Sequence, residues 1–583
     1  MFLKLFGTKK FTAPQALSTS RLDFERDNAR GIHPNWLIIL ASVWLATLGN
    51  WALWQELARL PEMNDLRALW FAGAFALLIM ALTAMLMSIV CWRWTLKPVI
   101  SIFLISAAVG GYFMLSYGVV IDSTMMVNVM QTDLRESRDL TSWKMLLAVL
   151  GFAVLPMVWL WRVQVKRVSV LRHIAHNILL FVAGCALSVL AVLPIYQDFA
   201  STMRNNIQLR FLINPLNSFY AVGDVLLKPL QSNANTTIVP LGTDAKLGKS
   251  YDYQPQSPIL ILVVGETARS GNFGINGYNR DTTPAMNQLQ KNSDKRGELT
   301  SFQNVWSCGT STATSLPCMF SHLGKSAFED NPQNYENLID VLKRAGLAVI
   351  WLENQSGCKG VCDRILSVST GRQNDPKFCN TGECLDEIML QQLSERLAVL
   401  PIDRIDKGVV VVMHQMGSHG PAYYKRSPEA FKKFQPECTT NILQDCTRAQ
   451  VTNAYDNTLL YTDHFLNSVV TYLKNIHPNA QSAMLYVADH GESLGENNIY
   501  LHGLPYAIAP DVQKRVPWIS WLSNDFLQRF GISAACLNQE KNKRLSHDNY
   551  FHSVLGLLDI RTSVYNPELD IYAACKIKID KIN

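Results

Sequence analysis

A loop rich in hydroxyl side chains lies between two cysteines in the segment SCGTSTATSLPCMFS, which runs from Ser307 to Ser321. A hydroxyl is a poor nucleophile at neutral pH unless a base or a metal ion lowers its pKa. Held rigidly over a divalent metal, it could attack a phosphorus or sulfur ester and form a covalent intermediate. The residues themselves leave five candidates open: Thr310, Ser311, Thr312, Thr314 and Ser315. For most of these the competing interpretation is the start of a short helix, which favours Ser and Thr as caps.

Side chains that could bind such a metal occur in two distant motifs. The stretch ADHGESLGE contains Asp489 and His490 side by side, with two glutamates close behind, and VVGETAR contributes Glu266. A mixed set of oxygen and nitrogen ligands suits zinc. His419 in MGSHGP and His502 in YLHGLPY are each followed by glycine, which lets the backbone approach a ligand closely, although a tight turn would also favour that glycine.

Buried strands that alternate with helices would position these residues. Short apolar runs alternate with helical stretches such as 337–345 and 451–474, and the runs are PILILVVGET, LAVIWLEN, GVVVVMHQ, SAMLYVADHGE and PWISWLS. This alternation indicates a doubly wound parallel sheet with helices on both faces. Ligands of such sheets bind beyond the carboxyl ends of the strands. The polar residues that follow four of the runs are Glu266, 354–359, His414 with His419, and Asp489 with His490. Each alone could be ordinary loop polarity, but four strand ends behave alike.

The first third of the 583-residue chain has the composition of a membrane domain. Five segments with few charges have about the length that an α-helix needs to cross a bilayer: 36–54, 69–91, 99–120, 145–161 and 178–194. A buried core helix is the alternative for each, and it is strongest for the short fourth segment. No cleavable signal peptide is expected, because the first apolar run lies far from the start and lacks a small-residue cleavage site.

Basic residues predict the orientation of these spans, because positively charged short loops stay in the cytoplasm. They gather before the first span and in the second and fourth connections: Lys4, Lys9, Lys10, Arg21, Arg26, Arg30, Arg93, Lys97, Arg162, Lys166, Arg167 and Arg172. The connections at 56–65 and 122–139 are mixed or acidic. The amino terminus is therefore expected inside and everything after Asp198 outside. The formal net charge of +6 is dispersed, so nothing suggests nucleic acid binding.

The cysteines support the same placement, because disulfides persist only in oxidising compartments. Two of the 12 cysteines fall in predicted spans, and the other ten lie in the part expected outside. Eight form close pairs and two remain as a candidate fifth pair: Cys308–Cys318, Cys358–Cys362, Cys379–Cys384, Cys438–Cys446 and Cys536–Cys575. A zinc ribbon is disfavoured because the spacings are uneven and the C-x-x-C knuckle is missing.

Taken together, these motifs closely resemble those of the lipid A phosphoethanolamine transferases, including the mobile colistin-resistance enzymes. The resemblance covers nearly the whole chain and rests on VVGETAR, NGYNRDTTP, SCGTSTATSLPCMFS, ENQSGCKGVCDR, HQMGSHGPAYYKR, NAYDNTLLYTD, DHGESLGENNIYLHGLPYAIAP and SHDNYFHSVLGLLDI. It implies an all-α membrane domain of about five helices followed by an α/β periplasmic domain of the alkaline phosphatase or sulfatase type. The expected domains are a membrane domain at 1–197, interfacial helices and a linker at 198–256, and a zinc-dependent catalytic domain at 257–583.

The resemblance also implies roles for individual residues. The nucleophile of the family, four residues after the first cysteine of its loop, corresponds to Thr312. The family's zinc ligands correspond to Glu266, Thr312, Asp489 and His490. Its residues for the substrate phosphate or a second metal match Lys359, His419 and His502, and His414 matches a histidine of less certain role. In the third span and the following loop, the family's polar lipid-binding residues have candidates in Asp122, Asn128 and Gln131, which an interfacial helix would explain nearly as well.

The reaction implied is a two-step transfer at the bacterial inner membrane, with one firmly bound zinc ion and a second left open. Thr312 would take phosphoethanolamine from phosphatidylethanolamine and pass it to a phosphate of lipid A, and the added amine would weaken the attraction of cationic polymyxins such as colistin. The protein is expected to act as a monomer. The alternatives are transfer to a different acceptor such as a core sugar, synthesis of glycerolphosphate polymers, and a membrane sensor without turnover. No residue of the expected site is missing, which argues against the sensor.

Overall fold

The computed structural model describes residues 31–61, 66–132, 134–231, 238–252, 256–291, 296–331, 333–371, 373, 375–380, 383–477 and 479–577. The basic residues of the sequence before residue 31 lie outside this described part. The chain divides into two compact units. We call Met1–Tyr112 with Trp143–Ser218 the membrane unit and Phe113–Ser142 with Phe219–Asn583 the sheet unit.

The regular elements of the membrane unit in its described residues are helices, joined by short connections. Its helices are α2 (Pro34–Ala46), α3 (Trp51–Ala58), α4 (Leu66–Val90), the first part of α5 (Leu96–Tyr117), α8 (Trp143–Val149), α9 (Leu155–Arg162), α10 (Val170–Val192), α11 (Tyr196–Asn205) and α12 (Gln208–Phe211). They form five helical stretches that are long and apolar enough to cross a membrane: Pro34–Ala58, Ala68–Val90, Leu96–Tyr117, Trp143–Arg162 and Val170–Asn205. The five predicted spans are therefore confirmed.

Large apolar side chains cover the outside of these helices. Trp36, Leu69, Leu146 and Leu179 each expose more than half of their surface. So broad an apolar surface is stable only against another apolar medium, and lipid tails provide one. Between the helices, Asn177 of α10 donates hydrogen bonds to the carbonyls of Ser88 and Cys91 at 2.9 and 3.1 Å. Such polar contacts are a usual way for helices to associate in lipid.

The sheet unit is built on an eight-stranded sheet with the order β13-β3-β12-β9-β2-β8-β4-β5. The strands are β2 (Ile259–Gly265), β3 (Gly297–Trp306), β4 (Ala348–Glu353), β5 (Leu366–Ser369), β8 (Val409–His414), β9 (Ser482–Ala488), β12 (Arg515–Ser523) and β13 (Leu545–Ser546). Strand β2 is buried at every position, as expected of a central parallel strand covered on both faces. Strands β9, β2, β8, β4 and β5 are parallel. The first four were predicted, whereas the short β5 was not.

One strand breaks the parallel pattern that the sequence predicted, and another was not predicted at all. Strand β12 runs antiparallel to both β9 and β3. Its apolar run gives no sign of direction, because strands buried on both faces have the same composition in either orientation. Strand β3 itself was not predicted, since its sequence GELTSFQNVW mixes polar and apolar residues. The paired short strands are β1 (Lys246–Leu247) with β14 (Ile560–Arg561), β6 (Cys379–Asn380) with β7 (Glu383–Cys384), and β10 (Ser493–Glu496) with β11 (Ile499–Leu501).

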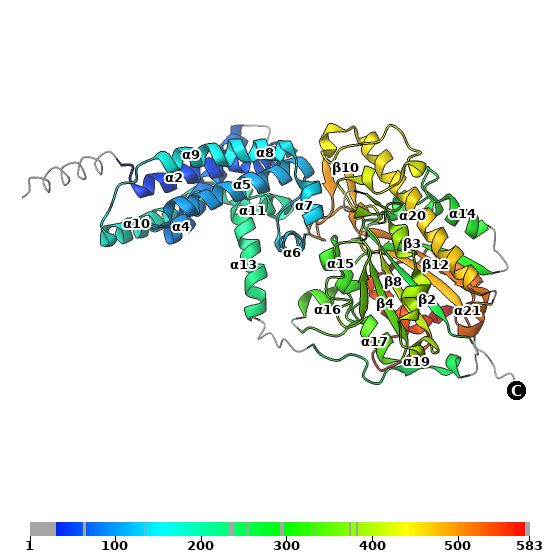
Figure 1. Ribbon diagram of the computed structural model, residues 1–583. Coiled ribbons are helices and arrows are strands. Elements are labelled where there is room, and N and C mark those ends of the chain that lie inside the picture. The colour runs from blue at the N-terminus through cyan, green and yellow to red at the C-terminus, as the bar shows by residue number, and fades with distance from the viewer. Residues whose placement is uncertain are drawn as a thin grey trace, which may run out of the picture. The chain divides into compact units, whose positions relative to one another are not determined.

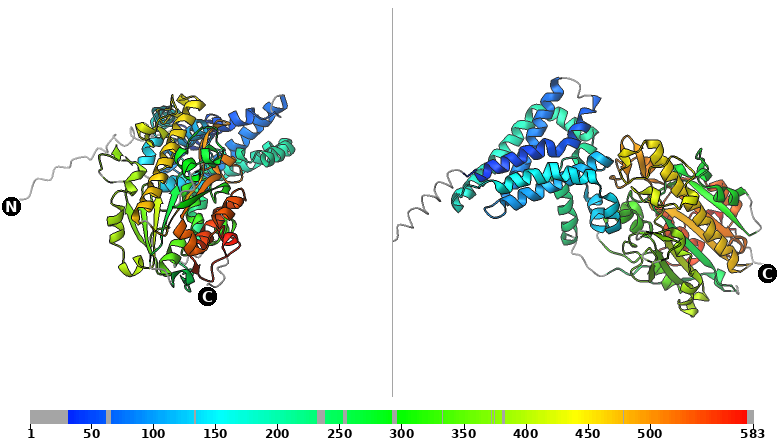
Figure 2. Two further views of the ribbon diagram at one scale, coloured as in Figure 1. Left: turned by 90° about the vertical axis from the view of Figure 1, so that its right-hand side faces the viewer. Right: turned by 45° about the horizontal axis from the view of Figure 1, so that its top comes forward.

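Helices cover both faces of the sheet, with α20 on one side and α15, α16 and α17 on the other (Figures 1 and 2). The helices are α6 (Ser123–Gln131), α7 (Leu134–Leu140), α13 (Leu216–Gln231), α14 (Pro284–Lys291), α15 (Thr312–Met319), α16 (Gly324–Asp330), α17 (Leu338–Arg344), α18 (Leu393–Ala398), α19 (Ile402–Ile405), α20 (Arg448–Ile476), α21 (Asn524–Phe530), α22 (Ala534–Glu540) and α23 (Tyr550–Leu557). The predicted helix at 451–474 begins three residues earlier than expected. Its start is fixed by a capping box in which Thr447 and Gln450 bond each other's backbone N–H groups.

Candidate active site

Four neighbouring strands of the sheet end at the same edge and carry the polar residues of the site. Strand β2 pairs with β9 up to Gly265 and Ala488, so the next residues, Glu266 and Asp489, follow side by side. On the other side of β2, strands β8 and β4 end at the paired residues His414 and Glu353. The arrangement therefore brings together side chains that are more than 200 residues apart in the sequence.

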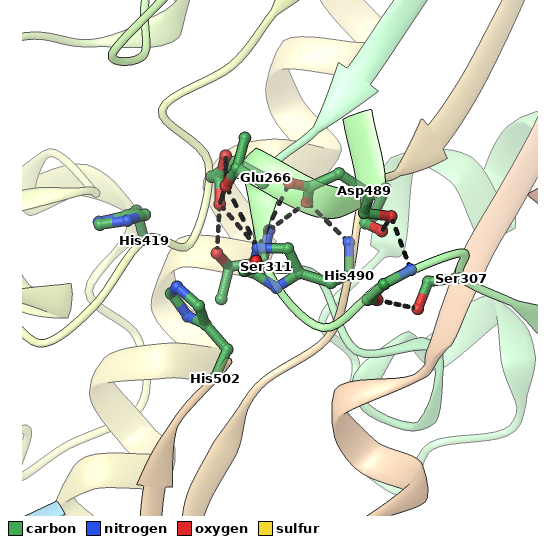
Figure 3. Close-up of polar contacts among 12 residues, drawn as sticks. Glu266, Ser307, Ser311, His419, Asp489, His490 and His502 are labelled. Carbon is green, nitrogen blue, oxygen red and sulfur yellow. Dashed lines mark hydrogen bonds and ion pairs between the residues drawn. The ribbon is translucent and has the colours of Figure 1, made fainter. Parts of the chain in front are cut away.

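Thr312 is the first residue of α15 and projects its hydroxyl into this group. Its Oγ1 donates toward the Glu266 carboxylate, at 3.1 and 3.2 Å from the two oxygens, and lies 3.3 Å from Nε2 of His490. The hydroxyl is thus at the amino end of a helix, where the backbone dipole favours negative charge. Figure 3 shows Glu266, Asp489 and His490 pointing toward one another, with His419 and His502 together on one side of this group.

The other hydroxyls of the loop make structural contacts. Thr310 donates to the carbonyl of Leu504 at 2.6 Å, and Ser315 donates to the carbonyl of Asp489 at 2.5 Å. Ser311 and Thr314 share a hydrogen bond of 3.2 Å across the start of the helix. Of the five candidate hydroxyl groups in this described loop, that of Thr312 makes the hydrogen bonds to Glu266 and His490.

The donor atoms around Thr312 fit a divalent metal. The ligand atoms of Glu266, Asp489 and His490 all lie within 4.8 Å of one another, and all three residues are buried. Oxygen Oδ2 of Asp489 is buried without a hydrogen-bond partner in the described structure. Two buried carboxylates beside an imidazole and a hydroxyl form a donor set that zinc accepts. A cation would also remove the repulsion between the two carboxylates, so the residues present fit the expected zinc.

Charge coupling within the group is strong. Burial and the charge of Glu266 raise the pKa of Asp489 to about 6. Burial alone would lower the pKa of His490, but the charge of Asp489 and contact with Glu266 raise it to about 9. Burial would raise the pKa of Glu266, yet the imidazoles of His414 and His490 hold it well below its usual range. The two carboxylates thus favour a positive charge beside them. Either a proton on His490 or a bound metal ion could supply this charge, so the two would compete.

His414 is fixed by a carboxylate that the sequence interpretation missed. Its Nδ1 lies 3.1 Å from Glu353, which also accepts a hydrogen bond of 2.8 Å from Trp351 Nε1. Its Nε2 lies 3.6 Å from Glu266. Burial would lower the pKa of His414, but the charge of Glu353 raises it to about 10. His414 is therefore a charged neighbour of Glu266. In the sequence, the one sign of Glu353 was its position as the last residue of the apolar run LAVIWLE.

His502 and His419 lie together on one side of the site (Figure 3). The two rings are 5.5 Å apart, and the ring of His502 is 4.4 Å from that of His490. Nδ1 of His502 lies 2.9 Å from Glu492, which also accepts a hydrogen bond of 2.7 Å from Tyr423. Burial and the positive charge of His490 lower the pKa of His502 to about 3, so its ring is neutral.

Lys359 lies in a different environment from the other predicted residues. It belongs to the loop closed by Cys358 and Cys362 and donates to Ser356 Oγ at 3.1 Å. Within the described part of the chain, its ammonium makes no hydrogen bond or ion pair with the other site residues. It lines a cavity of about 400 Å³ together with Pro317 of α15.

The short helices α6 and α7 belong to the sheet unit and border the site. Glu136 of α7 lies 3.6 Å from Nε2 of His419. Asp139 forms ion pairs with Lys425 and with Arg426, the latter at 2.9 Å, and Arg426 also donates to the backbone carbonyl of His419 at 3.0 Å. Arg426 is only 6% exposed, and truncating one partner of a buried ion pair is strongly destabilising. This contact fixes α7 and the His419 backbone to one another.

The sequence interpretation did not select Glu136, because the segment 122–139 has no strand end or motif that marks it. Of the residues that it did name there, Asp122 caps α6 by accepting a hydrogen bond of 2.9 Å from the backbone of Met125. Asn128 lies on α6, half-buried, and Gln131 is exposed. The capping role of Asp122 matches the interfacial-helix alternative.

Disulfides close several loops around the site. The structure forms Cys308–Cys318, Cys358–Cys362, Cys379–Cys384, Cys438–Cys446 and Cys536–Cys575. The first joins the residues just before Thr312 to the end of α15. Cys91 and Cys185, both in the membrane unit, are free.

Comparison with known proteins agrees with this architecture in both units. Residues 258–560 match the family model described as Sulfatase, and residues 79–230 match the model described as Phosphoethanolamine transferase EptA/EptB. The chain is 35% identical to the phosphoethanolamine transferase EptA of Escherichia coli K12, over 93% of this chain and 96% of that protein. It is 34% identical to the phosphatidylethanolamine transferase Mcr-1 of Escherichia coli, over 91% of this chain and 96% of that protein.

A solved structure is similar over both units. It is the integral membrane protein lipooligosaccharide phosphoethanolamine transferase A (EptA) from Neisseria meningitidis, with a TM-score of 0.86 and 36% identity over 93% of this chain and 98% of that one. The expected fold class, an all-α membrane domain joined to a sulfatase-like α/β domain, is confirmed. The chain is a multi-pass inner-membrane protein whose catalytic domain lies in the periplasm, and it belongs to the phosphoethanolamine transferase family of EptA and Mcr-1.

Proposed function

We propose that this transferase moves phosphoethanolamine from phosphatidylethanolamine to a phosphate of lipid A through a covalent intermediate on Thr312. The observation that carries the proposal is the position of the Thr312 hydroxyl, at the start of α15 and within hydrogen-bond distance of Glu266 and His490. Transfer to lipid A would add a cationic amine to the outer surface and so reduce its attraction for polymyxins.

In the first step, the Thr312 oxygen forms a bond to phosphorus, and the bond from phosphorus to the glycerol oxygen breaks. Thr312 gives up its proton to the Glu266 carboxylate, which its hydroxyl contacts. The leaving diacylglycerol oxygen gains a proton, and His419 is placed to supply it. In the second step, an oxygen of the lipid A phosphate gives its proton to His419 and attacks the same phosphorus. The bond from phosphorus to the Thr312 oxygen then breaks, and this oxygen takes its proton back from Glu266.

One zinc ion, held by Glu266, Thr312, Asp489 and His490, would favour the ionised hydroxyl and offset the negative charge on phosphorus. The neutral ring of His502 can hydrogen-bond a phosphoryl oxygen, and the charge of His414 keeps Glu266 ionised. We also assign Lys359 to the binding of the substrate phosphate, because the cavity that it lines is bounded by Pro317 of α15. The proposal also includes a second zinc ion beside His419 and His502. The enzyme would act as a monomer. Its domains would span residues 1–197, 198–256 and 257–583.

The ammonium group of the donor also needs a partner in the site. Glu136 of α7 lies next to His419, with a carboxylate oxygen 3.6 Å from its Nε2. An ammonium is recognised best by a charge-assisted hydrogen bond to a carboxylate. We therefore assign the ethanolamine end of the donor to Glu136.

Lipid A mass tests the reaction and its acceptor. In a Gram-negative host without its own transferase, the wild-type chain is expected to increase the mass of extracted lipid A by one phosphoethanolamine group. An unchanged lipid A, with the protein present in the membrane, would contradict the assigned acceptor. Mass spectrometry of the core oligosaccharide from the same cells would then reveal transfer to a core sugar.

Replacing Glu136 with glutamine is expected to raise KM for phosphatidylethanolamine by about tenfold or more, because a charged hydrogen bond contributes roughly 1.5–3 kcal/mol. The measurement is the rate of diacylglycerol release at varied donor concentration in mixed micelles. Arg138→Gln, a change on the same helix at an exposed position, is the control and should leave KM unchanged. An unaltered KM in the Glu136 variant would remove this residue from the donor site.

A further inference from the structure

A pocket of about 720 Å³ lies in the membrane unit, remote in sequence from every residue of the catalytic site. Its lining residues belong to the end of the unit where α2 and α10 begin and α9 ends. Figure 1 shows these helix ends on the same side of the unit. Its walls come from the start of α2, the connection between α4 and α5, and the connection between α9 and α10. These are the two basic connections of the sequence, and the fold brings them together around one cavity.

The walls of the pocket are held by specific hydrogen bonds. The connection after α9 pairs with the chain before α2, since Ile32 N donates to the Gln164 carbonyl and Lys166 N donates to the Ile32 carbonyl, both at 2.9 Å. The Lys97 ammonium donates to the carbonyls of Trp161 and Val163 at 3.1 and 2.8 Å and so caps the end of α9. The pocket is therefore part of the folded unit rather than a gap between loose loops.

The lining is cationic. Five basic side chains contribute to it: Arg93, Lys97, Arg162, Lys166 and Arg167. No carboxylate lines the pocket among the described residues. His173 also lines it, is only 6% exposed, and has an Nε2 atom with no hydrogen-bond partner in the described structure. A buried polar atom of this kind costs free energy unless something binds it.

Aromatic rings place the pocket at the level of lipid headgroups. Trp94 and Trp161 line it, Trp94 is 81% exposed, and the Arg93 guanidinium lies 5.1 Å from the Trp94 ring. Tryptophan is enriched where the bilayer meets water. Because the catalytic domain is periplasmic and the described residues before it form five spans, an odd number, this end of the helices faces the cytoplasm.

From these observations we propose that the pocket binds the headgroup of an anionic phospholipid of the cytoplasmic leaflet. Basic pockets between transmembrane helices on this side bind such headgroups in other membrane proteins. The volume suits a phosphodiester headgroup. The lining offers several cations to the phosphate and no carboxylate to an ammonium, so phosphatidylglycerol is preferred over phosphatidylethanolamine. Basic residues that served topology alone would need neither a cavity of this volume nor a buried imidazole nitrogen without a hydrogen-bond partner.

Native mass spectrometry of the full-length protein in detergent tests this site. With equal amounts of the two lipids added, the wild type should retain one phosphatidylglycerol at least tenfold more often than phosphatidylethanolamine. The double variant Arg93→Gln with Arg162→Gln should lose this preference. Arg172→Gln removes an exposed charge from the neighbouring start of α10 without lining the pocket, and it should behave as the wild type.

Three results would overturn the proposal: no lipid preference in the wild type, an equal loss in the Arg172 control, or displacement of the retained lipid by millimolar inorganic phosphate. The last would identify a site for free phosphate rather than lipid. Transfer activity in micelles of phosphatidylethanolamine serves as the check on folding, because the substituted residues lie outside the catalytic site. It should stay within about twofold of wild type in all variants.

Discussion

Replacing Thr312 with alanine is expected to reduce phosphoethanolamine transfer by roughly a thousandfold or more, because loss of a nucleophile removes the whole covalent route. The rest of the site should survive the change. Thr312 is the first residue of α15, where alanine is tolerated, and Ser311 remains as the residue before the helix. The loss should therefore appear in kcat, with the protein folded and the proposed metal ligands Glu266, Asp489 and His490 still in place. Initial rates of diacylglycerol release measure the effect.

Thr314→Ala is the matched control for this substitution. It removes a threonine hydroxyl from the same helix, two residues along, which bonds Ser311 rather than Glu266. It should keep transfer within a few-fold of wild type. Incubation with phosphatidylethanolamine and no acceptor should leave one phosphoethanolamine group on the peptide that contains Thr312 in the wild type and none in Thr312→Ala. A modified peptide elsewhere, or equal loss in both variants, would assign the nucleophile to another residue.

The choice of hydroxyl illustrates what the sequence could and could not predict. The residues of the loop permitted five nucleophiles, because local chemistry does not reveal which side chain faces the distant Glu266. Resemblance to a family selected Thr312 as the expected nucleophile, and in the fold its hydroxyl meets the residues that follow β2 and β9. Predicting it from the residues alone would have required the register of two strands more than 200 residues apart.

The strand order was predictable in part for a similar reason. Apolar runs and the polar residues after them indicated β2, β4, β8 and β9 and their common edge. The direction of β12 and the existence of β3 depend on pairing partners, which composition does not encode. Charged partners acting across elements were also missed. Glu353 meets His414 and Glu136 meets His419 only because separate elements are packed together.

Replacing Asp489 with asparagine is expected to remove the bound zinc and to lower transfer by at least about a hundredfold, since the site loses one charged ligand. The amide has the shape of the carboxylate. Its oxygen can still accept the hydrogen bonds that Asp489 Oδ1 receives from the backbone N–H groups of Thr267 and His490, at 3.1 and 2.7 Å. What changes is the charge beside Glu266. Zinc content by elemental analysis and transfer rate are the measurements.

Thermal stability separates loss of the metal site from misfolding. A chelator should lower Tm of the wild type, because a metal ion that binds the folded chain stabilises it and the chelator removes that contribution. Asp489→Asn is expected to bind no zinc and has one buried carboxylate fewer beside Glu266, so its Tm should not change with chelator and should equal or exceed that of the chelated wild type. Asp570→Asn, a buried carboxyl bonded to Tyr565 and Tyr572, should keep both zinc and the chelator effect. If Asp489→Asn retained zinc, or melted below the chelated wild type, Asp489 would be a structural carboxylate and the ligand set would need another member.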